Sequence, residues 1–490
     1  MIRTYMHYID GKWINTTSGK TYKRECPANG NLVAEYPLGT RDEALAAIAA
    51  ARKAFDKGLW PKMSGAKRAE FLFKYAEAIE KEKDKLARIE CEDVGKPIRE
   101  AIGEMQACAD FCRHAAGLAL NSHGEAYNNM GEDYVAMIVR EPKGVIGMIT
   151  PWNFPACTLF QKLPLALAAG CTAVIKPCSF TSGTTLELAR IAHECGIPAG
   201  VINVVTGSGS LVGNTIVESK NVDMISFTGS TEVGTKIIEK TAKNCTRVGM
   251  ELGGKSAMIV FNDCDMDDAI DGAMIGAFIN QGEECVATSR LLLEESIADE
   301  FVKKLAERTG KIRFGDIFDP ETQMGALIHE EHMNSVLDYI RIGKEEGAQL
   351  VCGGNRMTGG IYDKGFFVAP TIFDHVTPDM CIYKEEIFGP VLSVTRFKTK
   401  EEAIELANDS IYGLGGGVWT KDIDIAMEVA RAVRAGTMWV NTCIDGTVLT
   451  TFGGYKMSGI GREKGNAGFD EFTEVKTIQI HLGKRNPFYK

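Results

Sequence analysis

Residues 145–176 read VIGMITPWNFPACTLFQKLPLALAAGCTAVIK. The segment begins with a short apolar run at 145–149, passes into a helical stretch near 158–169 and returns to an apolar run at 173–175. Short apolar runs separated by helices are typical of strands that are buried on both faces of a parallel sheet. The segment therefore predicts a doubly wound α/β fold.

The same alternation continues toward the C-terminus. We predict a helix over 183–195, strands at 201–205 and 224–227, and a helix over 231–242. Ligands of such sheets bind at the carboxyl ends of the strands, so a site is expected there. A second alternating region extends from about residue 257 to about 455, and its predicted strands are 290–294, 391–396, 416–419 and 437–440.

Other periodicities flank these two regions. Amphipathic spacing predicts helices over 41–56 and 64–90, and helical character continues over 97–121. A strand is predicted at 134–140. The tail at 474–480 alternates like an exposed strand, and such a strand pairs readily with another segment or another subunit.

The composition is that of a globular protein with more than one domain. The chain has 490 residues, of which 45% are apolar and 24% are charged. A net charge of −10 disfavours a nucleic-acid partner, which would require a basic surface. No run approaches the roughly 20 apolar residues of a membrane span, and the first residues do not resemble a leader. We therefore expect a cytoplasmic enzyme with no nucleic-acid or membrane partner.

Fourteen cysteines are spread thinly along the chain. The sequence has no repeated C-x-x-C and no cluster of cysteine and histidine at zinc-binding spacing. Cys108 and Cys112 lie on a helical pattern beside His114, where packing against neighbouring helices is favoured over metal binding. We expect free thiols in a reducing compartment and no metal site.

One cysteine, Cys285, lies in the polar segment NQGEECVATSR at 280–290, just before the apolar run 291–293. A thiol at the edge of an element can act as a nucleophile, because the thiolate needs access and a suitable electrostatic environment. A half-buried, unreactive cysteine fits the same pattern. The segment alone leaves both interpretations open.

Two other segments carry candidate catalytic side chains. Asn153, in the motif PWNFP, could direct its amide toward a developing oxyanion or serve as a turn residue. Glu251, in the motif ELGGKS, could be a general base or a solvated carboxylate.

A glycine-containing segment, FTGSTEVG at 227–234, follows a predicted strand and opens a predicted helix. Gly229 and Gly234 would allow the backbone to approach a phosphate at the start of that helix. The segment does not match the dinucleotide fingerprint G-x-G-x-x-G, and an ordinary strand-to-helix turn has the same pattern.

Together, these segments resemble the aldehyde dehydrogenase superfamily from about residue 8 to 481. The motifs that carry the resemblance are PWNFP at 151, FTGSTEVG at 227, ELGGKS at 251, NQGEEC at 280, EEIFGP at 385 and FGGYKMSGIGRE at 452. The resemblance implies a Rossmann-like cofactor domain, an α/β catalytic domain and a small β extension that builds homodimers or homotetramers. The implied limits are 1–123 and 143–254 for the dinucleotide-binding domain, 255–457 for the catalytic domain, and 124–142 with 458–490 for the oligomerisation extension.

The resemblance also implies a mechanism. The Cys285 thiolate would attack an aldehyde, and the amide of Asn153 would hold the oxyanion together with the backbone N–H of Cys285. Glu251 would activate the water that hydrolyses the resulting thioester. Lys162 and Glu463 match positions that carry protons to and from Glu251.

The cofactor implied by the resemblance is NAD or NADP, and its binding residues come from several motifs. They are Trp152 and Ser230 at the phosphates, Lys176 and Glu386 at the ribose hydroxyls, Phe388 beside the nicotinamide, and Gly229 and Gly234 at the close approach to the backbone.

One departure from the family pattern concerns the cofactor. Most members continue the strand that ends at Lys176 as Lys-Pro-Ser-Glu, whereas this chain has Lys176-Pro177-Cys178-Ser179. A glutamate there would repel the 2′-phosphate of NADP, and Ser179 removes the repulsion and can donate a hydrogen bond. We therefore predict that NADP is accepted or preferred.

A second departure concerns the expected substrate tunnel, where polar or small residues replace the bulky ones common in members that act on simple aldehydes. They are Cys157, Thr158, Gln161, Gly446 and Thr447. Glu284, beside the nucleophile, either adds an anionic group that raises the pKa of Cys285 or points into solvent. The pattern favours a hydroxy- or amino-aldehyde, and a broad-specificity aliphatic enzyme is the alternative.

Two other functions use the same scaffold. A coenzyme A-acylating relative passes the thioester to a thiol, but such relatives usually lack the general base that Glu251 supplies here. A non-catalytic structural protein tends to lose the nucleophile or the cofactor residues, which are all present in this chain. The sequence therefore favours a hydrolytic, NAD(P)-dependent aldehyde dehydrogenase.

Overall fold

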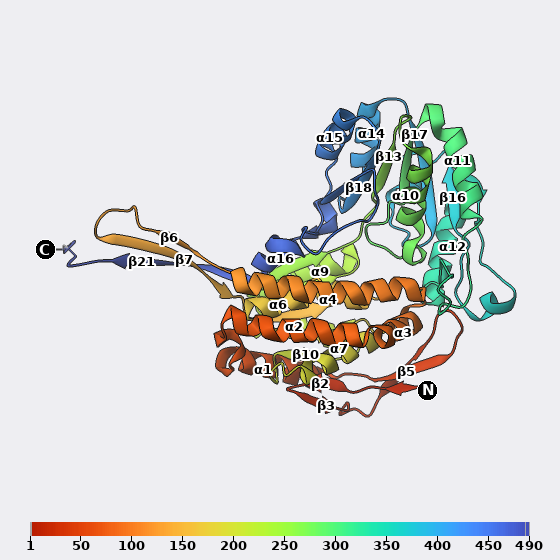
Figure 1. Ribbon diagram of the computed structural model, residues 1–490. Coiled ribbons are helices and arrows are strands. Elements are labelled where there is room, and N and C mark those ends of the chain that lie inside the picture. Colours follow the sequence, from red (N-terminus) through yellow and green to blue (C-terminus); the bar gives the residue numbers. More distant parts are fainter. Residues whose placement is uncertain (1, 486, 490) are drawn as a thin grey trace.

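The computed structural model describes residues 2–485 and 487–489. Residues 1 and 490, at which the predicted domains begin and end, and residue 486 lie outside the described residues. The described chain forms two α/β bodies and a thin arm that extends away from them (Figure 1). Each body is built on its own sheet, which confirms the α/β fold predicted from the sequence.

The first body contains an eight-stranded sheet with the order β20-β12-β11-β8-β9-β10-β2-β3. Its parallel strands are β8 (Val145–Ile149), β9 (Thr172–Lys176), β10 (Ile202–Val204), β11 (Met224–Thr228) and β12 (Arg247–Glu251). Antiparallel strands close the two edges: β2 (His7–Ile9) with β3 (Lys12–Ile14), and β20 (Gly459–Ile460). Ile149 pairs with Lys176, so the carboxyl ends of the central strands lie at one edge of the sheet.

Helices cover both faces of this sheet, because alternate residues of β8 pack into different apolar clusters. Ile146 and Met148 belong to one cluster, and Val145 and Ile149 belong to the other. The helices are α1 (Arg41–Lys57), α2 (Gly65–Lys81), α3 (Lys83–Val94), α4 (Ile98–Asn121), α5 (Pro155–Phe160), α6 (Leu163–Ala169), α7 (Gly183–Glu194), α8 (Asn214–Val217) and α9 (Thr231–Thr241).

Two of the predicted helices are each split in the structure. The predicted helix 64–90 is interrupted at Glu82, whose dihedrals (φ −102°, ψ 9°) are not helical. The predicted helix near 158–169 is interrupted at Lys162, and Pro164 stands at the start of α6. Proline lacks the N–H that would continue a helix from the preceding turn, so the chain restarts at this point.

The prediction missed a three-stranded sheet near the N-terminus. Its order is β1 (Arg3–Thr4), β5 (Leu32–Pro37) and β4 (Thr21–Glu25). These strands are short and β4 is largely exposed, so neither a long apolar run nor clean alternation marks them in the sequence.

The second body contains a seven-stranded sheet with the order β15-β16-β17-β14-β13-β18-β19. The strands are β13 (Ala257–Val260), β14 (Arg290–Glu294), β15 (Gln349–Cys352), β16 (Thr371–Asp374), β17 (Val391–Phe397), β18 (Gly415–Trp419) and β19 (Thr437–Val440), so the four strands predicted here are present. Its helices are α10 (Met266–Phe278), α11 (Glu295–Thr309), α12 (Glu330–Glu345), α13 (Cys381–Lys384), α14 (Lys400–Asn408) and α15 (Ile423–Ala432).

The arm is an antiparallel sheet with the order β21-β7-β6, formed by β6 (Glu125–Tyr127), β7 (Tyr134–Pro142) and β21 (Thr473–His481). The predicted tail strand therefore pairs with the predicted strand at 134–140. The first part of the expected extension 458–490 does not lie in the arm. β20 pairs with β12 of the first sheet, and α16 (Gly465–Glu471) packs against α4 and α6. No helix within the described residues combines the length and apolar character that a membrane crossing requires.

Candidate active site

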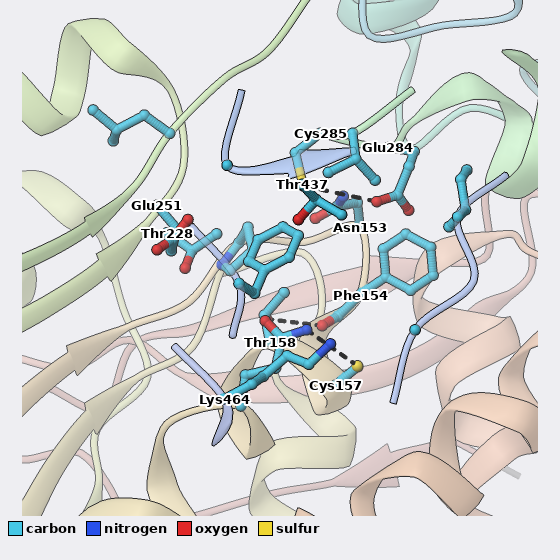
Figure 2. A pocket seen from close by; sticks show the side chains of 18 of the residues that line it. Asn153, Phe154, Cys157, Thr158, Thr228, Glu251, Glu284, Cys285, Thr437 and Lys464 are labelled. Carbon is cyan, nitrogen blue, oxygen red and sulfur yellow. Dashed lines mark hydrogen bonds between the residues drawn. The ribbon is translucent and has the colours of Figure 1, made fainter. Parts of the chain in front are cut away.

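A cavity of about 1060 Å³ lies between the carboxyl ends of the first sheet and the second body. Thr228 and Glu251 reach it from the ends of β11 and β12, and Cys285 and Thr437 reach it from the second body. Figure 2 shows the side chains of Asn153, Glu251 and Cys285 directed into this space from three separate elements. The structure therefore brings together the three side chains predicted to carry out chemistry.

Cys285 follows the 3₁₀ turn Ile279–Gly282 and precedes β14. Gly282 has φ +72°, and a Cβ there would lie 2.4 Å from the backbone of Gly389, so only glycine fits this bend. The bend presents the thiol to the cavity. Burial is the main cause that raises the pKa of Cys285 well above its usual value, and the Glu284 carboxylate is the next.

Asn153 lies in the loop between β8 and α5, and the residue is 4% exposed. Its Nδ2 donates a hydrogen bond to the backbone carbonyl of Glu283 at 2.9 Å. The same carbonyl also accepts a hydrogen bond from Nδ2 of Asn280 at 2.9 Å. A primary amide has two N–H groups, so this anchoring leaves the second N–H of Asn153 free to donate to a ligand in the cavity.

Glu251 is the last residue of β12 and is 3% exposed, so it is not a solvated carboxylate. Its Oε2 has no hydrogen-bond partner among the described residues. Burial raises the pKa of Glu251 well above its usual value and Glu463 raises it further, whereas Lys162 lowers it. A buried carboxylate with a free oxygen and a raised pKa has the properties of a general base.

Lys162 and Glu463 form a buried ion pair behind Glu251. The Lys162 ammonium also donates to the Thr228 hydroxyl at 2.6 Å. Burial is the main cause that raises the pKa of Glu463. The pair and Glu251 thus form a connected group of ionisable side chains, although Lys162 and Glu463 are far apart in the sequence.

Several residues matched to the cofactor line the same cavity: Trp152, Gly229, Ser230, Glu386 and Phe388. The rings of Trp152 and Phe388 meet edge to face at 5.2 Å between centroids. Glu386 accepts the backbone N–H of Gly254 at 3.0 Å, and burial raises its pKa to about 7. Ser230 caps the start of α9, where free N–H groups favour a phosphate.

Three other predicted cofactor residues do not line the cavity. Lys176 ends β9, and its ammonium donates to the carbonyl of Pro177 at 2.8 Å. The Ser179 hydroxyl donates to the carbonyl of Gly207 at 3.0 Å. Gly234 lies inside α9, where a Cβ would be 2.4 Å from the Leu252 side chain, so close packing accounts for this glycine.

Glu284 lines the cavity beside Cys285 and does not point into the surrounding solvent. One of its oxygens, Oε1, lies 3.7 Å from Sγ of Cys285. Burial is the main cause that raises the pKa of Glu284 to about 7, and the Lys96 ammonium opposes that rise. The carboxyl group is therefore poised to titrate near neutral pH, directly beside the thiol.

We expect Glu284→Gln to speed alkylation of Cys285 by iodoacetamide several-fold at pH 8. The substitution removes a negative charge 3.7 Å from the sulfur and so lowers the pKa of the thiol. Below about pH 6 the Glu284 carboxyl of the wild-type protein is protonated, because its pKa is about 7, and the two proteins should react alike. Glu284→Asp keeps the charge and serves as the control; equal alkylation rates for all three proteins at pH 8 would contradict this coupling.

The sequence motifs did not reveal two further charged residues of the cavity, Asp445 and Lys464. Lys464 directly follows Glu463 and lines the substrate side, near Cys157 and Thr158 (Figure 2). In the sequence, Lys464 is recognisable only as a cation directly after the motif that ends at Glu463. Where its side chain points depends on how β20 and α16 pack against the first body. Thr228, the partner of Lys162, was missed for the same reason.

The chain matches the model of the aldehyde dehydrogenase family over residues 13–478. It is 44% identical over 471 residues to the betaine aldehyde dehydrogenase of Bacillus subtilis (strain 168), with 96% of each chain covered. It is 42% identical to aldehyde dehydrogenase family 2 member C4 of Arabidopsis thaliana, with 97% of this chain and 94% of the relative covered.

Solved structures show the same likeness. The chain superimposes on an NAD-dependent aldehyde dehydrogenase from Sinorhizobium meliloti with a TM-score of 0.98 and 46% identity, covering 100% of this chain and 97% of the other. It superimposes on a betaine aldehyde dehydrogenase from Staphylococcus aureus, in complex with NAD+, with a TM-score of 0.96 and 39% identity, covering 98% and 95%. Matches of this extent, joined to the geometry of the cavity, show that the chain belongs to the aldehyde dehydrogenase family.

Proposed function

We propose that this protein oxidises a polar aldehyde to its carboxylic acid with NAD, by way of a covalent adduct on Cys285. The observation that carries the proposal is the convergence of Cys285, Asn153 and Glu251 on one cavity whose lining also includes the cofactor-matched residues. NAD enters the proposal because solved relatives are described as NAD-dependent or as complexes with NAD+.

Each residue has a defined task in this mechanism. The Cys285 thiolate attacks the aldehyde carbon, and Asn153 and the backbone N–H of Cys285 donate to the oxyanion of the thiohemiacetal. NAD bound in this cavity would supply the acceptor for the hydride of the adduct carbon, and the carbon on the Cys285 sulfur would then be at the oxidation level of a thioester. Glu251 then removes a proton from water, the hydroxide attacks the thioester, and the acid departs as the Cys285 thiolate leaves. Lys162 and Glu463 pass that proton onward.

The described residues are compatible with a dinucleotide. Gly253 is pressed against the Glu386 carboxylate, with its Cβ position 2.1 Å from Oε2, so a larger residue would displace the carboxylate matched to the ribose. Ser230 offers the N-terminal end of α9 to phosphate, and the cavity runs continuously from Ser230 to Cys285.

The polar character of the substrate is supported by the lining beyond Cys285. Glu284, Gln161 and Thr158 provide hydrogen-bonding groups there, and the Gln161 amide approaches the Cys157 sulfur at 3.8 Å. A hydroxyl or amino group beside the aldehyde would find partners in this lining that a plain alkyl chain cannot use. The description of two relatives as betaine aldehyde dehydrogenases agrees with a polar substrate.

An aldehyde panel tests the proposal. With NAD, we expect kcat/KM for betaine aldehyde, amino-aldehydes and hydroxy-aldehydes to exceed that for hexanal, and turnover to proceed without coenzyme A. A strong preference for hexanal would overturn the polar substrate. Absence of NADH formation with every aldehyde, or a requirement for coenzyme A, would overturn the hydrolytic dehydrogenase itself.

The cofactor preference is a separate hypothesis that rests on Ser179. We expect measurable kcat/KM with NADP, and Ser179→Glu should lower the ratio of NADP to NAD efficiency about ten-fold or more, because a carboxylate repels the 2′-phosphate. Ser179→Ala keeps the site uncharged and isolates the contribution of the hydroxyl, which already donates to Gly207. A large preference of the wild-type enzyme for NAD would refute acceptance of NADP.

We also propose that the arm mediates assembly into a homodimer or homotetramer. β21 is the edge strand of its sheet and bears the exposed apolar residues Val475 and Ile478, features that favour pairing with a second copy. Light scattering on the intact protein tests this, and a monomer at micromolar concentration would contradict it.

A further inference from the structure

The substrate side of the cavity contains one cation, Lys464, that forms no ion pair with a carboxylate among the described residues. Its ammonium lies 5.8 Å from the centre of the Phe452 ring and 3.7 Å from the position of a Cβ on Gly446. Phe452 and Gly446 both line the cavity, so the ammonium is at the cavity wall and not on the outer surface. Within the part of the chain that the structure describes, the ammonium forms no ion pair within 4.0 Å and no side-chain hydrogen bond, although the Glu463 carboxylate acts on it electrostatically.

The nearby carboxylates are engaged elsewhere. Glu463, the preceding residue, attracts the Lys464 ammonium electrostatically but forms its ion pair with Lys162. Asp445 accepts a hydrogen bond from the Thr442 hydroxyl. Glu284 faces the sulfur of Cys285 at 3.7 Å. A half-buried cation without a counter-ion is costly, and a ligand anion would relieve that cost.

The backbone of Lys464 provides a second, independent observation. Its dihedrals are φ +60° and ψ 171°, a region that is essentially reserved for glycine. A lysine held there is strained, and such strain persists where the surrounding structure and the function require it. Gly465, the next residue, begins α16. The strained backbone conformation of Lys464 thus places its side chain at the cavity while the chain turns into the helix.

The cavity therefore has two differently charged ends. Figure 2 shows Glu284 beside Cys285 at one side, and Lys464 next to Cys157 and Thr158 at the other. Burial raises the pKa of the Cys157 thiol and the Lys464 ammonium opposes that rise, which agrees with this placement. An aldehyde held at Cys285 would extend past Cys157 and Thr158 toward the ammonium.

We propose that Lys464 is a specificity-determining residue that binds an anionic group at the far end of the substrate, so that the preferred aldehydes carry a carboxylate or a phosphate. This inference rests on the proposed aldehyde oxidation and narrows its substrate class. A hydroxyl or amino group close to the aldehyde remains compatible with it, because that group would lie near Glu284 and not near Lys464.

The test compares aldehydes of equal chain length with and without a terminal carboxylate. The pairs are 4-oxobutanoate with butanal, 5-oxopentanoate with pentanal, and 6-oxohexanoate with hexanal. For at least one pair, we expect the wild-type enzyme to show a higher kcat/KM for the anionic aldehyde. Glyceraldehyde 3-phosphate against glyceraldehyde distinguishes a phosphate from a carboxylate as the preferred anion.

Substitutions at Lys464 assign the preference to this residue. Lys464→Gln should lower the ratio of anionic to neutral kcat/KM about ten-fold, through KM, since one charge-assisted hydrogen bond is lost. Lys464→Arg should retain most of the ratio, and Lys464→Glu should invert it. The exposed Lys303→Gln, on α11 and outside the cavity, removes the same charge and should leave the ratio at its wild-type value.

The possible failures are distinguishable. If the wild-type enzyme oxidises neutral aldehydes but shows no preference within any pair, the role of Lys464 is overturned while aldehyde oxidation stands. If Lys464→Gln reduces kcat/KM equally for both members of a pair, the lysine has only a structural role and the inference is also overturned. If no aldehyde of any class is oxidised, the proposed function itself has failed.

Discussion

Cys285→Ala should abolish aldehyde oxidation, with kcat lowered by roughly four orders of magnitude or more. No other thiol is placed to substitute for it: Cys157, the other cysteine that lines the described cavity, lies at the far side beside Lys464. Without the sulfur no covalent adduct forms on the aldehyde carbon. The tetrahedral intermediate whose carbon gives up the hydride is therefore never made. NADH formation with a saturating aldehyde measures the loss.

A matched control separates the loss of the nucleophile from damage to the fold. Cys443→Ala removes a thiol that lies 3.9 Å from the Thr288 hydroxyl and does not line the cavity. We expect this variant to remain active, and the Cys285→Ala protein to keep its thermal unfolding midpoint and its binding of NAD. Substantial turnover by Cys285→Ala would refute the nucleophile.

Glu251→Gln should stop the reaction after the first half. The amide cannot accept a proton from water, and loss of a general base typically costs about 10²–10⁴-fold in rate. Thioester formation does not require this base once the thiolate is present, so we expect a burst of NADH close to one equivalent per active site, followed by very slow turnover. Rapid mixing with fluorescence detection of NADH measures both phases.

The pH dependence of the same step follows from the raised pKa of Glu251. The base must be deprotonated to act, and burial together with Glu463 shifts its protonation to higher pH than is usual for a glutamate. Deacylation should therefore fall as the pH decreases through this raised pKa, and rise toward a plateau above it. Glu251→Gln should remove that dependence from its residual rate. A burst that is absent in Glu251→Gln, or a pH profile unchanged by the substitution, would contradict the assignment.

Much of the fold could be predicted because its signals are local. The buried strands β8, β9 and β11 are short continuous apolar runs, and such runs are recognisable without knowing their partners. The strands β1, β4 and β5 were not predicted. They form because the folded chain brings these segments side by side, and their own composition does not mark them as strands. The split at Lys162 follows from a local cause, Pro164, that the helical periodicity of the surrounding residues concealed.

The chemistry divides along a similar line. The sequence by itself determined that a cysteine, an asparagine and a glutamate stand in motifs shared with a known family, since residue identity and short spacing are written directly in the chain. Only the tertiary structure decided which charges meet: that Glu284 faces the thiol, that Glu463 is paired with Lys162, and that Lys464 lines the cavity without an ion pair among the described residues. The physical reason is that electrostatic interactions depend on distance and burial, and both are fixed only when remote segments meet in the folded protein.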